Sequence, residues 1–164
     1  MSGRTAATDA FWRAFVEHRG GGDDGYVVVA FGDGPAMATA LAELVVAGTK
    51  RATASLLRDY SDGGEALPRV GDFVVVVDGA GTPRCIWRTT RVDIAPLVAV
   101  DEAFAWEEGE GDRTRDDWLE GHRRYFSRQA ARDGFVMHDD IATVFERFAV
   151  VWPPAIADRG TAGS

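Results

Sequence analysis

The sequence has little of several residue types, and each scarcity excludes a class of structure. Cys85 is the one cysteine among 164 residues, so the chain can form neither an internal disulfide nor a zinc site built from several cysteines. No apolar run approaches the roughly 18 residues of a membrane-spanning helix, and the N-terminus lacks the charged-then-apolar pattern of a signal peptide. We therefore expect a cytoplasmic protein with no membrane partner, in which Cys85 is a buried strand residue.

Positive charge is also scarce. The chain carries 18 Lys and Arg residues against 26 Asp and Glu residues, which gives a net charge of −8 and a pI near 4.8. Binding to long duplex DNA depends on many cationic contacts with phosphates, so this balance argues against it. A small basic pocket stays compatible with a net negative charge, because a cleft concentrates its own local field.

Lysine is nearly absent. Lys50 is the one lysine among the 18 basic residues, and it lies two residues after Gly48, where we expect a helix to end. Arginine cannot act as a base near neutral pH, whereas a desolvated lysine can. Lys50 is therefore a candidate catalytic base, and the alternative is an ordinary solvated lysine.

The hydroxyl groups that follow Lys50 suggest a partner for it. In an extended segment Arg51, Thr53 and Ser55 share one face, and a lysine still in the preceding turn can curl toward Thr53. A neutral lysine can activate a hydroxyl nucleophile. The alternative for Thr53 is an ordinary β-strand residue.

The residues that are abundant predict one folded domain of α+β class. An apolar share of 46 % over 164 residues is enough for a full core. Helices placed among strands without a regular βαβ alternation predict a mostly antiparallel sheet. Such a sheet can be open or can close into a small barrel. We expect three helices: one capped by Thr8 or Asp9, one from Pro35 to about Ala47, and one from Thr114 to Gly134. We expect strands over Tyr26–Phe31, in a hairpin within 71–94, and over Thr143–Trp152, and the short segment 51–57 is also β-capable.

An acidic segment between the hairpin and the last helix carries six carboxylates and is expected to be partly helical. It can be a solvated loop, a divalent-cation site, or a loop that turns one carboxylate inward as a general acid or base. Gly109 and Gly111 would let the backbone bend tightly there. The residues do not choose among these, nor which carboxylate turns inward: Asp101, Glu102, Glu107, Glu108, Glu110 and Asp112.

The helix after this segment is rich in arginine. Those arginines that stay unpaired, such as Arg124 and Arg128, are candidates to hold phosphate. His122 lies on the aromatic face and is expected to be a packed core residue, and the three histidines show no metal-ligand spacing. Trp106 is a candidate to stack on a base, with core packing as the alternative.

Four ordered blocks resemble the ASCH domain family: "FGDGPAMATALAELVVAGTKRATASLL", "VGDFVVVVDGAGTPRCIWRTTRV", "FAWEEGEGDRTRDDWLEGHRRYFS" and "FERFAVVW". The resemblance implies a PUA-like small β-barrel flanked by helices, with a groove that accepts a nucleoside or RNA. Gly48, Lys50 and Thr53 match the family's signature, and Ser55 stands where that signature often has arginine. The resemblance covers 26–152 and implies an ASCH domain there. The residues themselves predict a helix and linker before it (1–25) and a disordered tail after it (153–164).

The resemblance implies two activities, neither of which needs a metal or cofactor. Members that deacetylate N4-acetylcytidine use a lysine, a threonine and a glutamate, which match Lys50, Thr53 and Glu108, with Glu107 and Glu110 as alternatives to Glu108. Members that cleave RNA use a lysine and a serine, which match Lys50 and Ser127. A non-catalytic module that binds RNA or a ligand is the third hypothesis. Substrate contacts are expected from Arg51, Ser55, Trp106, Arg124 and Arg128.

Overall fold

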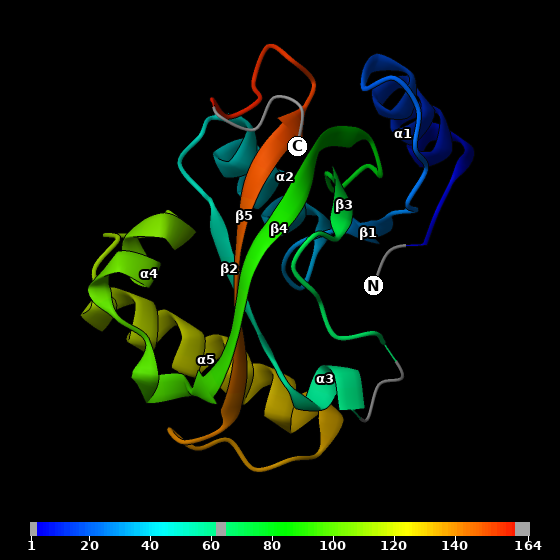
Figure 1. The fold of residues 1–164 in the computed structure, drawn as a ribbon. Coiled ribbons are helices and arrows are strands. Elements are labelled where there is room, and N and C mark those ends of the chain that lie inside the picture. Colours follow the sequence, from blue (N-terminus) through cyan, green and yellow to red (C-terminus); the bar gives the residue numbers. More distant parts are fainter. Residues whose placement is uncertain (1–2, 62–64, 160–164) are drawn as a thin grey trace.

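The computed structural model describes residues 3–61 and 65–159, and it has the predicted α+β, PUA-like architecture. Figure 1 shows the long strands β4 and β5 running through the middle, with α1 on one side and α4 and α5 on the other. The elements are α1 (Ala6–His18), β1 (Val27–Val29), α2 (Pro35–Val46), β2 (Ala52–Leu56), α3 (Arg58–Ser61), β3 (Phe73–Val77), β4 (Pro83–Pro96), the 3₁₀ turn η1 (Leu97–Ala99), α4 (Glu102–Glu108), α5 (Arg115–Asp133) and β5 (Ala142–Trp152).

The strands form a curled, half-barrel sheet in the order β1-β3-β4-β5-β2. Every neighbouring pair is antiparallel except β1 and β3, which are parallel. The predicted hairpin is β3 and β4, and the predicted last strand is β5. The mostly antiparallel sheet expected from the sequence is therefore confirmed.

The uninterrupted apolar run of β3 is explained by helices on both faces of the sheet. Phe73, Val75 and Val77 pack with α1, whereas Val74 and Val76 pack with α2. A strand covered on both faces needs apolar residues at every position rather than at alternate ones. Cys85 of β4 lies in the α2 core with no exposed surface, as predicted, and burial raises the pKa of its thiol to about 12.

Two details at the N-terminal end differ from the sequence expectations. The N-cap of α1 is Thr5 rather than Thr8 or Asp9, because Thr8 occupies the third helical position and its side chain hydrogen-bonds back to Thr5 in a capping box. Asp9 instead accepts a hydrogen bond from the Tyr26 hydroxyl. The first strand is also shorter than 26–31, because only Val27–Val29 pair with β3.

The described part of the predicted C-terminal tail is held to the domain. The Asp158 carboxylate accepts hydrogen bonds from the Arg51 guanidinium at 2.8 Å and from the backbone N–H of Val150 at 2.9 Å. These contacts join residues 153–158 to the start of β2. Residues 160–164 of that tail lie outside the described residues.

One carboxyl within the sheet forms no ion pair with any other described residue. Glu146 of β5 is 7 % exposed, and the Thr89 hydroxyl donates a hydrogen bond to it at 2.7 Å. Burial raises the pKa of Glu146, against the opposing effect of hydrogen bonds from Thr89 and Trp87. The protonated carboxyl is thus favoured in the folded state.

Glu146→Gln is expected to stabilise the protein at pH 7 by about 1 kcal/mol, the scale of a typical stabilising substitution. A carboxyl whose pKa is raised by folding contributes stability at low pH that is lost as the pH rises through the folded-state value. Urea unfolding at pH 4 and pH 7 measures this: the advantage of the variant should appear only at the higher pH. Glu120→Gln, at an exposed ion pair, is the control that should change little, and equal stability of Glu146→Gln and wild type at pH 7 would contradict the expectation.

Candidate functional site

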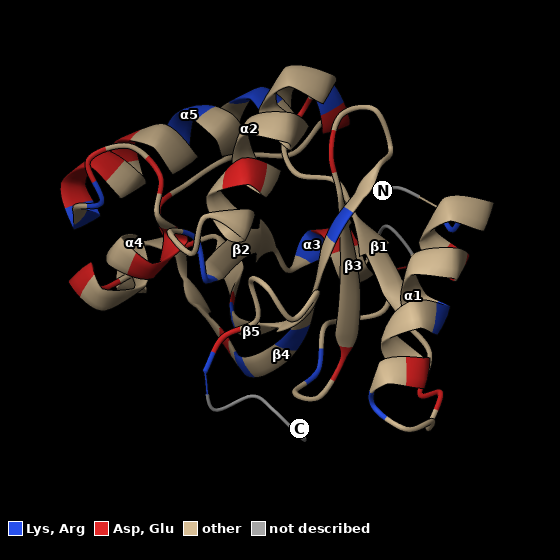
Figure 2. Cartoon of the chain, turned by 90° about the horizontal axis from the view of Figure 1, so that it is seen from above, with Lys and Arg blue, Asp and Glu red and all other residues tan. Residues whose placement is uncertain are grey.

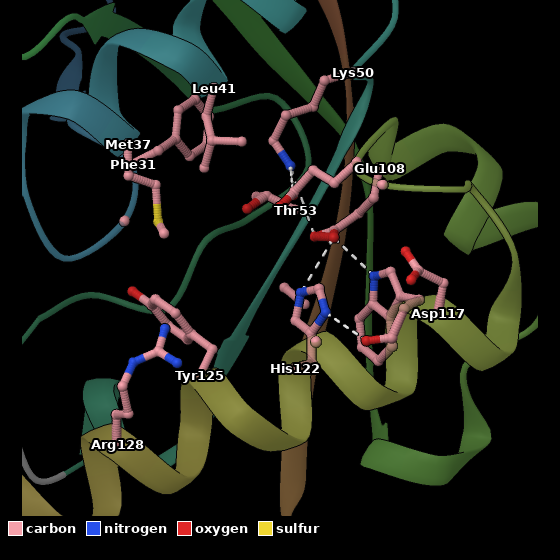
Figure 3. Close-up of a pocket in the computed structure, with 16 residues that line it drawn as sticks. Phe31, Met37, Leu41, Lys50, Thr53, Glu108, Asp117, His122, Tyr125 and Arg128 are labelled. Carbon is pink, nitrogen blue, oxygen red and sulfur yellow. Dashed lines mark hydrogen bonds and ion pairs between the residues drawn. The ribbon is translucent and has the colours of Figure 1, made fainter.

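A cavity of about 270 Å³ opens between α2, β2, α4 and α5. Figure 3 shows its two unlike walls. One wall is apolar and comes from the β1–α2 region: Phe31, Met37 and Leu41. The other wall is polar, and all of its side chains except Thr53 are ionisable: Lys50, Thr53, Glu108, Glu110, Asp117, His122, Tyr125 and Arg128.

Lys50 reaches the cavity because α2 ends just before it. Gly48 takes a φ of +88°, which turns the chain out of the helix, and the Lys50 N–H still bonds to the Leu44 carbonyl at 3.1 Å. The Lys50 side chain is only 1 % exposed, and its Nζ lies 5.2 Å above the centre of the Phe31 ring. A buried ammonium requires partners, and two carboxylates supply them. The solvated-lysine alternative is therefore wrong.

Glu108 is the most completely enclosed of these carboxylates. It is the last residue of α4, and its Oε1 lies 3.7 Å from Lys50 Nζ. Its Oε2 accepts a hydrogen bond from Trp118 Nε1 at 2.7 Å and lies 3.2 Å from His122 Nε2. Burial by itself would raise the pKa of Glu108, but Lys50, His122 and Trp118 together lower it to about 2. Glu108 is thus a fixed anion at physiological pH.

His122 is the site residue that the sequence reasoning missed. Its ring stacks on Trp118 with the ring centroids 3.7 Å apart, so the expected packing is present. However, Nδ1 also faces the Trp118 carbonyl at 2.9 Å while Nε2 faces Glu108. Both contacts are hydrogen bonds donated by the imidazole only when both ring nitrogens carry protons.

The protonation of His122 agrees with its surroundings. Burial lowers the pKa of His122, but Glu108 and the Trp118 carbonyl raise it by more, so the net shift is upward. The signal available in the sequence was the spacing of four residues between Trp118 and His122, directly after the acidic loop. That spacing indicates a stacked pair, but it does not indicate that a carboxylate lies opposite.

Glu110 lies on a tight loop whose glycines are required by close contacts. A Cβ on Gly109, where φ is +74°, would lie 2.5 Å from the Thr49 carbonyl oxygen. A Cβ on Gly111 would lie 2.1 Å from the Asp117 carboxylate, which accepts a hydrogen bond from the Asp112 N–H at 3.0 Å. Because the two glycines have no side chain, the loop can pack closely against Thr49 on one side and α5 on the other.

The loop brings the Glu110 carboxylate to within 2.8 Å of Lys50 Nζ. The Glu110 side chain remains 33 % exposed and lines the cavity. Burial raises the pKa of Glu110 and the Glu108 charge adds to this, while Lys50 opposes it. Of the three possibilities for the acidic segment, an inward-turned carboxylate is what the structure contains. The described residues contain no group of three or more metal-ligating side chains arranged for a metal ion.

The buried charges of the site balance. The Lys50 ammonium and the His122 imidazolium face the carboxylates of Glu108 and Glu110. Figure 2 shows further acidic positions where α4 meets the start of α5, so these two cations lie in acidic surroundings. A site of this kind suits a neutral or weakly charged ligand better than a polyanion.

The structure brings four of the sequence-predicted site residues into the cavity: Lys50, Thr53, Glu108 and Arg128. Thr53 belongs to β2, and Arg128 lies at the α5 side, 3.5 Å from Asp33. The lysine and threonine are therefore in one cavity, as the hypothesis for their partnership requires.

The other predicted residues lie outside the cavity lining. Arg51 is engaged with Asp158, the Ser55 hydroxyl is 2.6 Å from the Tyr60 hydroxyl, and Trp106 is exposed beneath the Arg113 guanidinium. Arg124 is exposed and paired with Glu120, and Ser127 is exposed on α5. Any part that these residues take in binding must therefore be outside this cavity.

Comparison with known proteins finds relatives of this chain in sequence and in fold. The sequence model of the ASCH domain matches residues 27–152. The crystal structure of an ASCH domain from Lactobacillus crispatus JV V101 is 31 % identical, with a TM-score of 0.83 over 93 % of this chain and 99 % of that one. Protein EF3133 from Enterococcus faecalis V583 is 36 % identical, with a TM-score of 0.79 over 87 % of this chain and 86 % of that one. No curated protein matches the sequence.

Described residues include no helix that is long and apolar enough to cross a membrane.

Proposed function

Because the chain belongs to the ASCH domain family, we propose that it binds a nucleoside or an RNA end in this cavity and hydrolyses an amide of the N4-acetylcytidine type. The observation that carries the proposal is a buried lysine, held between two carboxylates, in the same cavity as the Thr53 side chain. The volume of about 270 Å³ is near the lower end of the range for small-molecule sites. The apolar wall offers Phe31 and Met37 to the flat face of a base.

In the proposed reaction Lys50, as the amine, accepts the proton of the Thr53 hydroxyl or of a water molecule. The resulting oxygen attacks the acetyl carbonyl, and the carbon–nitrogen bond breaks as N4 takes up a proton. The products are cytidine and acetate, the latter released directly or after hydrolysis of an ester on Thr53. Glu108 positions Lys50, because its fixed negative charge lies 3.7 Å from Nζ. The proposed reaction uses no metal ion.

RNA cleavage is supported less well by the geometry. The cavity holds one arginine, Arg128, and its nearest acidic partner is Asp33. Ser127 and Arg124, which that activity would use, lie outside the cavity lining. A polyanionic substrate would meet the carboxylates of Glu110 and Asp117, which repel phosphate.

Thr53→Val is expected to lower the turnover of N4-acetylcytidine by about 100-fold or more, because it removes the hydroxyl and keeps the β-branched shape. Chromatography of the released cytidine measures this. Ser55→Ala is the matched control on the same strand, since Ser55 lies outside the cavity lining.

Parallel incubation of the wild-type protein with short single-stranded RNA, with and without a chelator, identifies a ribonuclease. Saturable binding of the nucleoside with no product would instead identify a non-catalytic module and reject the proposal.

A further inference from the structure

The two carboxylates beside Lys50 differ in what they can do. Glu108 Oε2 is already engaged by Trp118 and His122, and Oε1 faces Lys50. Its side chain is 2 % exposed. A proton placed on Glu108 would compete with the Trp118 and His122 donors, and Glu108 presents very little surface to the cavity that it lines. Glu108 is therefore an anchor for Lys50 rather than a group that exchanges protons.

Glu110 has the opposite surroundings. Its Oε2 accepts the hydrogen bond from Lys50 at 2.8 Å, and the side chain remains one-third exposed toward the cavity. The loop between Gly109 and Gly111 holds it there through backbone contacts with Thr49 and α5. A carboxyl that is both bonded to the base and open to the cavity can receive a proton from one and deliver it to the other.

We propose that Glu110, and not Glu108, is the carboxyl that exchanges protons with the substrate, acting with Lys50 as one acid–base pair. This assignment rests on the proposed function. Lys50 and Glu110 share one proton along their hydrogen bond, and when it lies on Glu110, the lysine amine is the base and the carboxyl is the acid. Lys50 then accepts the proton of the attacking oxygen, and Glu110 gives its proton to the leaving N4 as the carbon–nitrogen bond breaks.

The proton count closes over one turnover. The pair begins with one shared proton, gains one from the attacking water and gives one to the amine. It ends as the Lys50 ammonium and the Glu110 carboxylate, which is the other form of the same pair. When Thr53 is the nucleophile, the same two transfers form and then hydrolyse its acetyl ester. One water molecule is consumed, and cytidine and acetic acid are released; the acid then loses its own proton to solvent and becomes acetate.

The groups that face Glu110 favour this sharing. Lys50 follows α2, Glu108 ends α4, and His122 and Asp117 come from α5. The His122 imidazolium neutralises Glu108, so Lys50 is not tied to that carboxylate alone. Burial and the Glu108 charge raise the pKa of Glu110 and Lys50 opposes this, with a net upward shift, so the surroundings favour a proton on Glu110.

Glu110→Gln is expected to lower kcat for N4-acetylcytidine by about 100- to 10,000-fold with little change in KM, the usual range for a lost general acid. Wild type should lose activity as the pH falls through the raised pKa of Glu110, because a second proton on the pair blocks the base. The variant should lack this acid limb. Added formate should restore part of the turnover of Glu110→Ala, which a merely structural role would not allow.

Glu107→Gln is the matched control, because Glu107 lies on α4 but contacts Arg147 outside the cavity. It should retain wild-type kcat, and thermal melts should show that the Glu110 variants remain folded. A folded Glu110→Gln enzyme with a kcat within about threefold of wild type, and with the same loss of activity at low pH, would overturn the assignment of Glu110. The proposed function would still stand in that case. A wild-type protein that releases no cytidine overturns the proposed function, and the assignment falls with it.

Discussion

Lys50→Met is expected to abolish hydrolysis and to lower the free energy of unfolding by about 3–5 kcal/mol, the usual cost of removing one partner from a buried ion pair. Methionine occupies a similar volume, but it leaves Glu110 without its hydrogen-bond donor and Glu108 with His122 as its one remaining cationic partner. Urea unfolding at pH 7 and the cytidine assay measure the two effects. Arg132→Met, at an exposed cation paired with Asp133, is the stability control.

Two further variants separate the charge of Lys50 from its chemistry. Lys50→Arg keeps a cation but cannot act as a base, so it should recover part of the stability and none of the activity. Lys50→Met combined with Glu110→Gln should be more stable than the sum of the single changes predicts, because the double variant leaves one fewer unpaired buried charge. A Lys50→Met protein as stable as wild type would contradict the ion-pair description, and one that still releases cytidine would contradict the proposed reaction.

Gly109→Ala is expected to lower the free energy of unfolding by more than 2 kcal/mol and to reduce activity strongly. The left-handed backbone of Gly109 costs an L-residue about 1 kcal/mol, and its new Cβ would lie 2.5 Å from the Thr49 carbonyl oxygen. Backbone must move to relieve that contact, and Thr49 directly precedes Lys50. The Arg51 N–H also bonds to the Glu107 carbonyl at 2.6 Å, so the same movement strains the connection between α4 and β2.

Gly134→Ala is the matched control for this prediction. Gly134 has a similar φ of +79° at the end of α5, but a Cβ there meets no described heavy atom within 4 Å. It should therefore cost only the backbone strain of about 1 kcal/mol. The difference between the two variants in urea unfolding isolates the close approach to Thr49. If both variants lowered the free energy of unfolding equally, the loop would be able to move away from Thr49 without cost. Gly109 would then not hold Glu110 in place.

Much of the fold follows from local signals in the sequence. Thr114 and Gly134 mark the ends of α5 because capping depends on side chains within a few residues of the helix end. Gly48 ends α2, and the apolar run of β3 is visible directly. The cap of α1 was misplaced by one turn, because both Thr5 and Thr8 can accept backbone hydrogen bonds and only the helix geometry selects between them.

For the site, the sequence by itself singled out Lys50, through the scarcity of lysine, and the glycine-flanked acidic loop, through its composition. Which carboxylate turns inward was decided only by the tertiary structure. Gly109 and Gly111 direct Glu110 to the cavity through close approaches to Thr49, which is far away along the chain, and to Asp117 on the following helix. His122 became a site residue in the same way, because the carboxylate of Glu108, which raises the pKa of His122, comes from another helix. Local propensity is carried by neighbouring residues, whereas the pairing of buried charges depends on distances that only the packed chain sets.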